Sequence, residues 1–169
     1  GRAVHSVQVR GSQPLTLMAE NFGGNEESDY QLFSIPYDIP NALDAILLAM
    51  DQAGYPDFNK KYWRLYAYNG GYEEITNNFY SLSMGEAYFF IWNKDKISER
   101  PLFDFGTGHP STVTDPPFEI YLQPSEWKFF GVPYDFPIPL EQIYTDNGEY
   151  IGDVGSLYAV SYTHLTLPT

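Results

Sequence analysis

Two Tyr-Asp pairs are the first candidates for chemistry in this sequence. Asp38 and Asp135 each follow a tyrosine and precede an apolar residue and a proline. Two carboxylates that face one another across a cleft can share acid and base roles in glycoside hydrolysis, and with backbone carbonyls they can bind Ca²⁺. An Asp just before a helix more commonly accepts hydrogen bonds from the N–H groups of its own turn. We therefore expect that structural role and keep the pair only as weak metal-ligand candidates.

Aromatic residues are the stronger candidates, and they point to binding rather than catalysis. Along residues 63–69, Arg64, Tyr66 and Tyr68 alternate with Trp63, Leu65 and Ala67, so each set shares one face of an expected strand. Sugar rings stack on exposed aromatic faces, and polar side chains at the rim bind their hydroxyl groups. The predicted ligand-binding residues are Arg64, Tyr66, Tyr68, Asn69 and Tyr72. The alternative is that this face is covered by other parts of the chain, as is common for aromatic-rich strands.

Other catalytic groups are scarce. Before the last ten residues the only histidines are His5 and His109, and the chain has no cysteine. This excludes disulfides, thiolate metal sites and a Cys nucleophile. Ser34 lacks the Gly-x-Ser-x-Gly pattern of a hydrolase elbow. We predict no catalytic residue, no cofactor and no enzymatic activity.

An internal repeat organises the elements that position these residues. The segment FSIPYDIP at residues 33–40 returns as FGVPYDFP at residues 130–137, and Leu-Tyr-Ala at 65–67 returns at 157–159. Such duplication predicts two similar structural units. Ser34 of the first copy corresponds to Gly131 of the second, so the position needs a small residue for close packing rather than a hydroxyl group.

The expected fold is mainly β, with two similar units of strand, short helix and antiparallel β-meander, the second truncated. Strands are predicted at residues 31–35, 63–69, 72–76, 86–92, 102–105 and 118–122. One helix is predicted over 41–53, with Asn41 as its N-cap, Asp44 bonding back to the cap and Gly54 ending it. A shortened copy of this helix is expected at 139–144.

Charge and composition exclude several classes of partner. The chain has 22 acidic and 9 basic residues and a net charge of −13, which repels phosphate backbones and anionic membrane surfaces. No apolar run is long enough to span a bilayer. We expect neither nucleic-acid binding nor membrane insertion.

Domain boundaries are expected near the two ends. Residues 1–29 are interpreted as a strand of a preceding domain, at 4–10, followed by an acidic linker; the alternative is that this strand is an edge strand of the duplicated domain. Residues 30–159 form the duplicated β-rich domain, with copy one at 30–109 and an incomplete copy two at 118–159. Residues 160–169 resemble the in-frame translation of a transposon-end adaptor used for sequencing libraries, and the chain has no initiator Met. We therefore interpret the sequence as a metagenomic fragment of a longer protein.

The first copy also resembles a known module. Ser-Ile-Pro at 34–36, Trp63-Arg64, Tyr-Glu-Glu at 72–74 and Gly-Glu-Ala-Tyr at 85–88 are similar to a repeat in large secreted multidomain proteins of Gram-negative environmental bacteria. Met84 stands where Pro is common, Phe89 stands where Trp is common, and the second copy departs further. The resemblance implies an extracellular, non-catalytic accessory module with no catalytic residues to transfer.

The predicted function is a structural or interaction module of a secreted or cell-surface bacterial protein. Its partners would be neighbouring domains of the same chain, a polysaccharide or a surface protein. One alternative is a carbohydrate-binding module attached to a secreted enzyme. The other is a hydrolase fragment in which Asp38 and Asp135 are paired acids.

Overall fold

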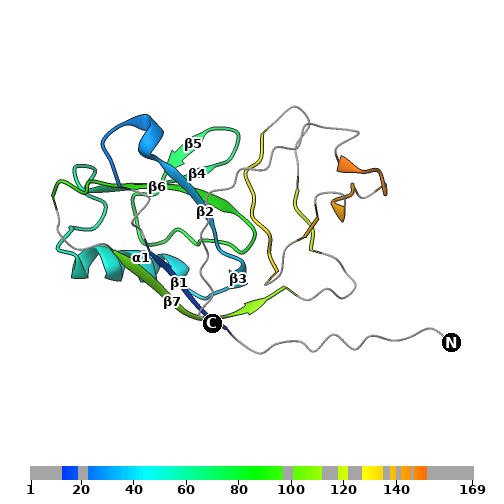
Figure 1. The fold of residues 1–169 in the computed structure, drawn as a ribbon, viewed down its shortest axis with the longest axis horizontal. Helices are drawn as coiled ribbons and strands as arrows, with labels where there is room; N and C mark the ends of the chain where they lie inside the picture. The colour runs from blue at the N-terminus through cyan, green and yellow to red at the C-terminus, as the bar shows by residue number, and fades with distance from the viewer. Residues whose placement is uncertain are drawn as a thin grey trace.

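The described part of the chain forms two antiparallel β-sheets and one α-helix (Figure 1). The computed structural model describes residues 13–18, 23–96, 101–111, 118–121, 127–134, 138–139, 142–145 and 147–151. The elements in chain order are β1 (Gln13–Met18), the 3₁₀ helix η2 (Glu27–Asp29), β2 (Gln31–Ser34), β3 (Tyr37–Asp38), α1 (Ala42–Gln52), β4 (Trp63–Tyr68), β5 (Tyr72–Glu74), β6 (Ala87–Trp92) and β7 (Leu102–Pro110). The prediction of a mainly β chain with antiparallel pairing is confirmed.

The larger sheet has the strand order β2-β6-β4-β5 and carries the candidate site. In β4, Trp63, Leu65 and Ala67 are buried, whereas the intervening side chains are half-buried, as the alternation predicted. The Asn-Gly-Gly turn joins β4 to β5 in the expected hairpin, with Tyr68 opposite Tyr72. One face of this sheet therefore belongs to the core, and the other remains accessible.

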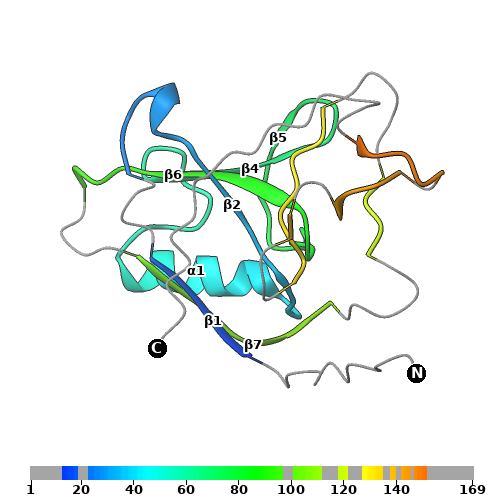
Figure 2. The same cartoon turned by 45° about the vertical axis from the view of Figure 1, so that its right-hand side comes forward.

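Helix α1 covers the core face, and Figure 2 shows it lying beneath the sheet. Leu43, Ile46 and Met50 form its buried stripe. The helix ends in a Schellman motif, in which the N–H groups of Gly54 and Tyr55 donate to the carbonyls of Asp51 and Met50. Gly54 has a φ of 81°, which the motif requires and glycine adopts without a Cβ clash.

The other end of the helix differs from the prediction. Asn41 is the N-cap residue, but its side chain makes no capping hydrogen bond. Its backbone is left-handed, with a φ of 56°, instead of extended. An extended N-cap backbone is what directs a cap side chain toward the first free N–H groups of a helix. The capping mechanism predicted for Asn41 is therefore wrong, although the helix position is right.

The repeated FSIPYDIP motif carries the chain from one sheet to the other. Its first residues end β2, which pairs with β6, and its Tyr37 and Asp38 form β3, which pairs with β7. Strand β7 is longer than predicted because it continues through Gly106 and Gly108. A Cβ on Gly108 would lie 2.6 Å from the Cβ of Tyr37, so this glycine permits close strand approach instead of ending the strand.

The smaller sheet, ordered β1-β7-β3, includes residues upstream of Tyr30. Strand β1 pairs antiparallel with β7. Another residue upstream of Tyr30 contacts the larger sheet, since the Gly24 N–H donates to the carbonyl of Trp92 in β6 over 3.0 Å. Phe103 of β7 meets Phe90 of β6 edge to face, with ring centroids 5.1 Å apart. This contact joins the two sheets through one core. The strand predicted at 4–10 lies outside the described residues.

The start of the second copy packs against the first copy. The Gly131 N–H donates to the Gly85 carbonyl over 2.9 Å, and Phe130 forms an antiparallel bridge with Glu86. A Cβ added to Gly131 would overlap the side chain of Ser34, its counterpart in the repeat. The need for a small residue at this position thus has a direct cause, since the two equivalent positions contact each other. We call residues 127–131 the docking segment.

Only part of the remaining second copy can be described. Asp135 lies outside the described residues, and so do 140 and 141 of the expected helix. Tyr144, at the end of that predicted helix, forms an antiparallel bridge with Tyr150.

Candidate functional site

The accessible face of the larger sheet carries a continuous set of aromatic rings. We call this set the aromatic face, and its members are Tyr30, Tyr66, Tyr68, Tyr72, Phe89 and Phe129. Cross-strand register places Leu32, Phe89, Tyr66 and Glu74 in one row across the four strands. The site therefore follows from β-strand alternation, which points one set of side chains into the core and the other set away from it.

The rings of the aromatic face contact one another edge to face. Tyr72 is central, with ring centroids 5.2 Å from both Tyr68 and Phe89 and 6.5 Å from Tyr66. Phe129 of the docking segment closes one end, 5.1 Å from Tyr68 and 5.0 Å from Phe89. Interplanar angles between 74° and 88° mean that Tyr66, Tyr68 and Tyr72 do not form a coplanar platform.

Exposure is concentrated on Tyr72. Its side chain is 64% exposed, whereas Tyr66, Tyr68 and Phe89 are half-buried. At the far end Tyr30 meets Tyr66 edge to face at 5.7 Å. Partial burial raises the pKa of Tyr30 to about 12, and the neighbouring Tyr66 hydroxyl adds to the shift. The face thus presents one prominent ring supported by a fixed layer of others.

Charged residues border the aromatic face along β5. Arg64 Nε and Nη2 donate to the two carboxylate oxygens of Glu74 over 2.8 and 3.3 Å, and Lys60 Nζ lies 2.6 Å from Glu74 Oε2. The Arg64 guanidinium lies 5.1 Å from the centroid of the Tyr66 ring, a cation–π distance. Its hydrogen bonds hold the pKa of the Glu74 carboxyl below its usual range, and Lys60 lowers this pKa further. The Arg64 guanidinium is therefore held in place by its contacts with Glu74 and Tyr66.

This arrangement predicts an acid-dependent loss of stability. A depressed carboxyl pKa contributes stability above the ordinary pKa of the group, and the contribution is lost as pH falls through the folded-state pKa. We expect Glu74→Gln to lower the free energy of unfolding at neutral pH by about 1 kcal/mol. The difference in free energy of unfolding between the wild type and Glu74→Gln should disappear at a pH well below the ordinary carboxyl pKa. Urea unfolding of both proteins across this pH range measures it, and an equal gap throughout would contradict the assignment.

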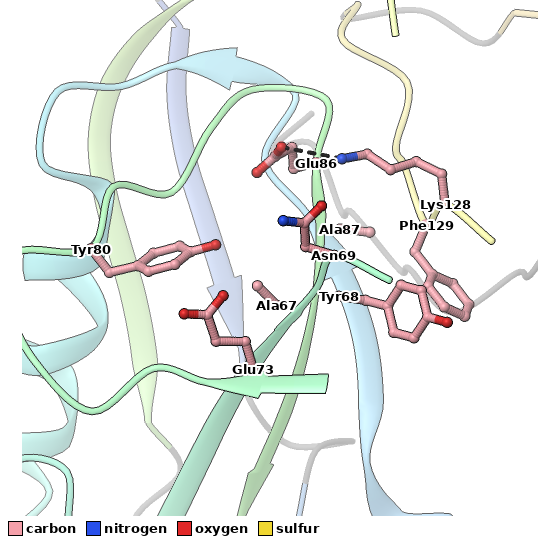
Figure 3. A pocket seen from close by; sticks show the side chains of 9 residues that line it. All are labelled: Ala67, Tyr68, Asn69, Glu73, Tyr80, Glu86, Ala87, Lys128 and Phe129. Atoms are coloured by element: carbon pink, nitrogen blue, oxygen red, sulfur yellow. Dashed lines mark hydrogen bonds and ion pairs between the residues drawn. The ribbon is translucent and has the colours of Figure 1, made fainter. Parts of the chain in front are cut away.

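A small pocket of about 150 Å³ lies beside the aromatic face, where β4 ends and β6 begins (Figure 3). We call it the hairpin pocket, and its lining residues are Ala67, Tyr68, Asn69, Glu73, Tyr80, Glu86, Ala87, Lys128 and Phe129. Figure 3 shows the Tyr80 hydroxyl and the Glu73 carboxylate pointing toward the same space as the Asn69 amide. Tyr68 and Phe129 belong to both the aromatic face and this pocket.

An ion pair and a buried tyrosine fix one wall of the hairpin pocket. Lys128 Nζ lies 3.5 Å from Glu86 Oε1, and the buried Tyr88 hydroxyl donates to Glu86 Oε2 over 3.0 Å. The same hydroxyl accepts the Ser83 N–H over 2.7 Å. Partial burial raises the pKa of Tyr80, and the carboxylates of Glu86 and Glu73 add to this shift. The pocket is therefore polar, with its negative charge close to the Tyr80 hydroxyl.

The structure divides the five predicted binding residues between two neighbouring surfaces. Arg64, Tyr66 and Tyr72 belong to the aromatic face and its border, Asn69 lines the hairpin pocket, and Tyr68 contributes to both. Sequence reasoning missed Phe89, which the apolar run of β6 concealed. It also missed Glu73, Glu86, Lys128 and Phe129. The docking segment could have been suspected from the repeat, because Phe129 corresponds to Leu32 on the same sheet face.

The other predicted site is the Asp38–Asp135 pair, and the structure describes only Asp38. Asp38 is exposed on β3 opposite His109, and Asp135 lies outside the described residues, so their proposed pairing stays a prediction. Within the described part of the chain, no group of three or more His, Asp or Glu side chains could hold a metal ion. None of its helices has the length and apolar character needed to cross a bilayer.

The chain matched no protein family, no curated protein and no solved structure. Inference about its function therefore rests on the aromatic face and the hairpin pocket.

Proposed function

We propose that the chain is a non-catalytic interaction module of a secreted or cell-surface bacterial protein. The aromatic face would be its contact surface, and a neighbouring domain or surface protein would be its partner. The observation that carries this proposal is the exposed Tyr72 ring, supported at its edges by Tyr66, Tyr68 and Phe89. Tyrosine is prominent at protein interfaces because it combines a large apolar area with few rotatable bonds and a polar tip.

Two further features support a protein partner. The aromatic face already receives a segment of the chain itself, since Phe129 packs on Tyr68 and Phe89. The Lys60–Glu74–Arg64 cluster gives one edge of the aromatic face a charged border, and a polar edge beside an apolar centre is usual in a protein interface.

The proposal predicts that Tyr72 dominates binding to a neighbouring domain. We expect the isolated chain to bind the adjacent domains of its parent polypeptide when they are supplied separately. Tyr72→Ala should weaken this binding by about tenfold or more, the size expected for a central aromatic contact. Tyr121→Ala is the matched control, because Tyr121 is 87% exposed and lies outside the aromatic face. Equal affinities for the two variants in calorimetric titrations would contradict the proposal.

Carbohydrate binding is the second candidate, and the position of Asn69 favours it. Asn69 lies at the end of β4, beside the Tyr68 ring and within the hairpin pocket, where an amide could bond sugar hydroxyl groups. A glycan-array screen of the wild type and of the Tyr66→Ala/Tyr68→Ala double variant tests this candidate. Binding by the wild type that the folded double variant loses would favour a glycan partner. A folded wild type that binds no glycan would leave the protein-partner proposal standing.

A further inference from the structure

The hairpin pocket has a chemical character that the aromatic face does not share. Its volume of about 150 Å³ is below the 300–1,000 Å³ typical of sites for whole small molecules, and corresponds to roughly five waters. The pocket is therefore suited to one end group of a larger molecule. Which end group it accepts depends on the charges and hydrogen-bonding atoms around it.

The charge of the pocket is unbalanced. Glu86 pairs with Lys128, whereas no lysine or arginine in the described residues pairs with Glu73. One negative charge remains, together with the Tyr80 hydroxyl and the Asn69 amide on the same cavity (Figure 3). Two carboxylates disfavour an anion, and a Ca²⁺ ion needs six to eight oxygen ligands. Lys128 already neutralises one of the two carboxylates, Glu86. A monovalent organic cation satisfies the remaining charge.

The apolar wall of the pocket further limits the kinds of ligand that fit. The Tyr68 and Phe129 rings stand at one side of the cavity, 5.1 Å apart and nearly perpendicular. Aromatic rings stabilise nearby ammonium groups, and they also pack against the methylene stem that carries such a group. The Lys128 side chain already places an ammonium group at the Glu86 wall, which leaves Glu73 on the opposite side for a second one.

We propose that the hairpin pocket binds a primary alkylammonium group. The ammonium donates to the Glu73 carboxylate and to the oxygens of Tyr80 and Asn69, and its methylene stem lies against Tyr68 and Phe129. Two kinds of molecule carry such a group, a protein through the side chain of a lysine and a glycan through the amine of an amino sugar. The inference does not rest on the proposed function of the aromatic face, because Tyr72 does not line the pocket.

The test is a titration of the ¹⁵N-labelled chain with n-butylammonium chloride, followed by backbone amide shifts. We expect saturable shifts at Tyr68, Asn69 and Glu73, in the roughly millimolar range for so small a ligand. n-Butanol is the neutral control of the same shape, and KCl controls for ionic strength. Equal saturable shifts with n-butanol, or none with n-butylammonium, would overturn the proposal.

Variants test the role of Glu73. We expect Glu73→Gln to weaken n-butylammonium binding by about tenfold, because it removes a charge-assisted acceptor. Glu27→Gln in η2 is the matched control, since it removes one exposed carboxylate outside the pocket and should leave affinity unchanged. Glu73 is exposed, so the variant should fold, and its own spectrum reports whether it does. Equal affinities of the two variants would contradict the assignment.

Two further ligands distinguish a lysine side chain from an amino sugar as the source of the ammonium group. In Nα-acetyl-lysine methylamide the side-chain ammonium of lysine is the only charged group. Glucosamine carries the amine of an amino sugar. Preferential binding of the first identifies a protein partner that presents a lysine. Preferential binding of the second identifies an amino sugar and would favour the glycan candidate for the whole module.

Discussion

Gly131→Ser should lower the free energy of unfolding by about 1–3 kcal/mol, the usual cost of forcing extra atoms into a packed site. The new Cβ would overlap the side chain of Ser34, which occupies the equivalent position in the first copy of the repeat. Because the backbone around Gly131 is held by its hydrogen bond to Gly85, the docking segment cannot simply move away without losing that bond. Urea unfolding followed by tryptophan fluorescence measures the loss.

The repeat offers a direct control for this effect. Adding Ser34→Gly to Gly131→Ser exchanges the two residues between equivalent positions, so the contact keeps one side chain and one glycine. We expect most of the lost stability to return in the double variant. Gly71→Ser serves as the neutral comparison, because a Cβ there meets no atom within 4 Å. A double variant whose loss of stability equals the sum of the losses in Gly131→Ser and Ser34→Gly alone would argue against contact between the two positions.

Gly85→Ala should have an effect of similar or greater size, about 3 kcal/mol. Gly85 has a φ of 77°, where a Cβ is strained, and that Cβ would lie 2.7 Å from the Phe118 ring. The residue also links the two copies, since its N–H donates to Ile35 and its carbonyl accepts the Gly131 N–H. The substitution therefore strains the backbone and the packing at the same junction.

Gly54→Ala separates these two causes. Gly54 has a similar φ of 81°, but a Cβ there has no neighbour within 4 Å, so its substitution should cost only about 1 kcal/mol. The excess cost at Gly85 then measures the packing against Phe118. Removing that ring with Phe118→Ala in the Gly85→Ala background should reduce this excess cost in stability. Equal costs for Gly85→Ala and Gly54→Ala would show that the junction is not tightly packed.

Local patterns in the sequence were enough to predict the strands of the larger sheet and its β4–β5 hairpin. Alternation along β4 correctly separated buried Leu65 from half-buried Tyr66, and the Asn-Gly-Gly turn set the hairpin that brings Tyr72 beside Tyr68. The apolar stripe and Gly54 likewise located helix α1. These features depend on residues close together in the chain, where periodicity and turn chemistry decide the outcome.

Features that depend on distant residues could not be predicted in the same way. The hairpin pocket combines Asn69, Tyr80, Glu86 and Lys128, and only chain topology brings them together. Strand β7 continues beyond its predicted end at residue 105, and Gly108 permits its close approach to Tyr37. A glycine signals either a turn or a close contact, and only the neighbouring strand decides which of the two applies.

Tyrosine nitration followed by peptide mass spectrometry tests the proposed interaction surface most directly. It compares the isolated chain with the longer secreted polypeptide that we propose contains it. If the aromatic face is a contact surface, Tyr72 should react in the isolated chain and be protected in the longer polypeptide. Tyr121 should react in both, and the fully buried Tyr88 in neither. Equal reactivity of Tyr72 in the two samples would contradict the proposal that a neighbouring domain covers the aromatic face.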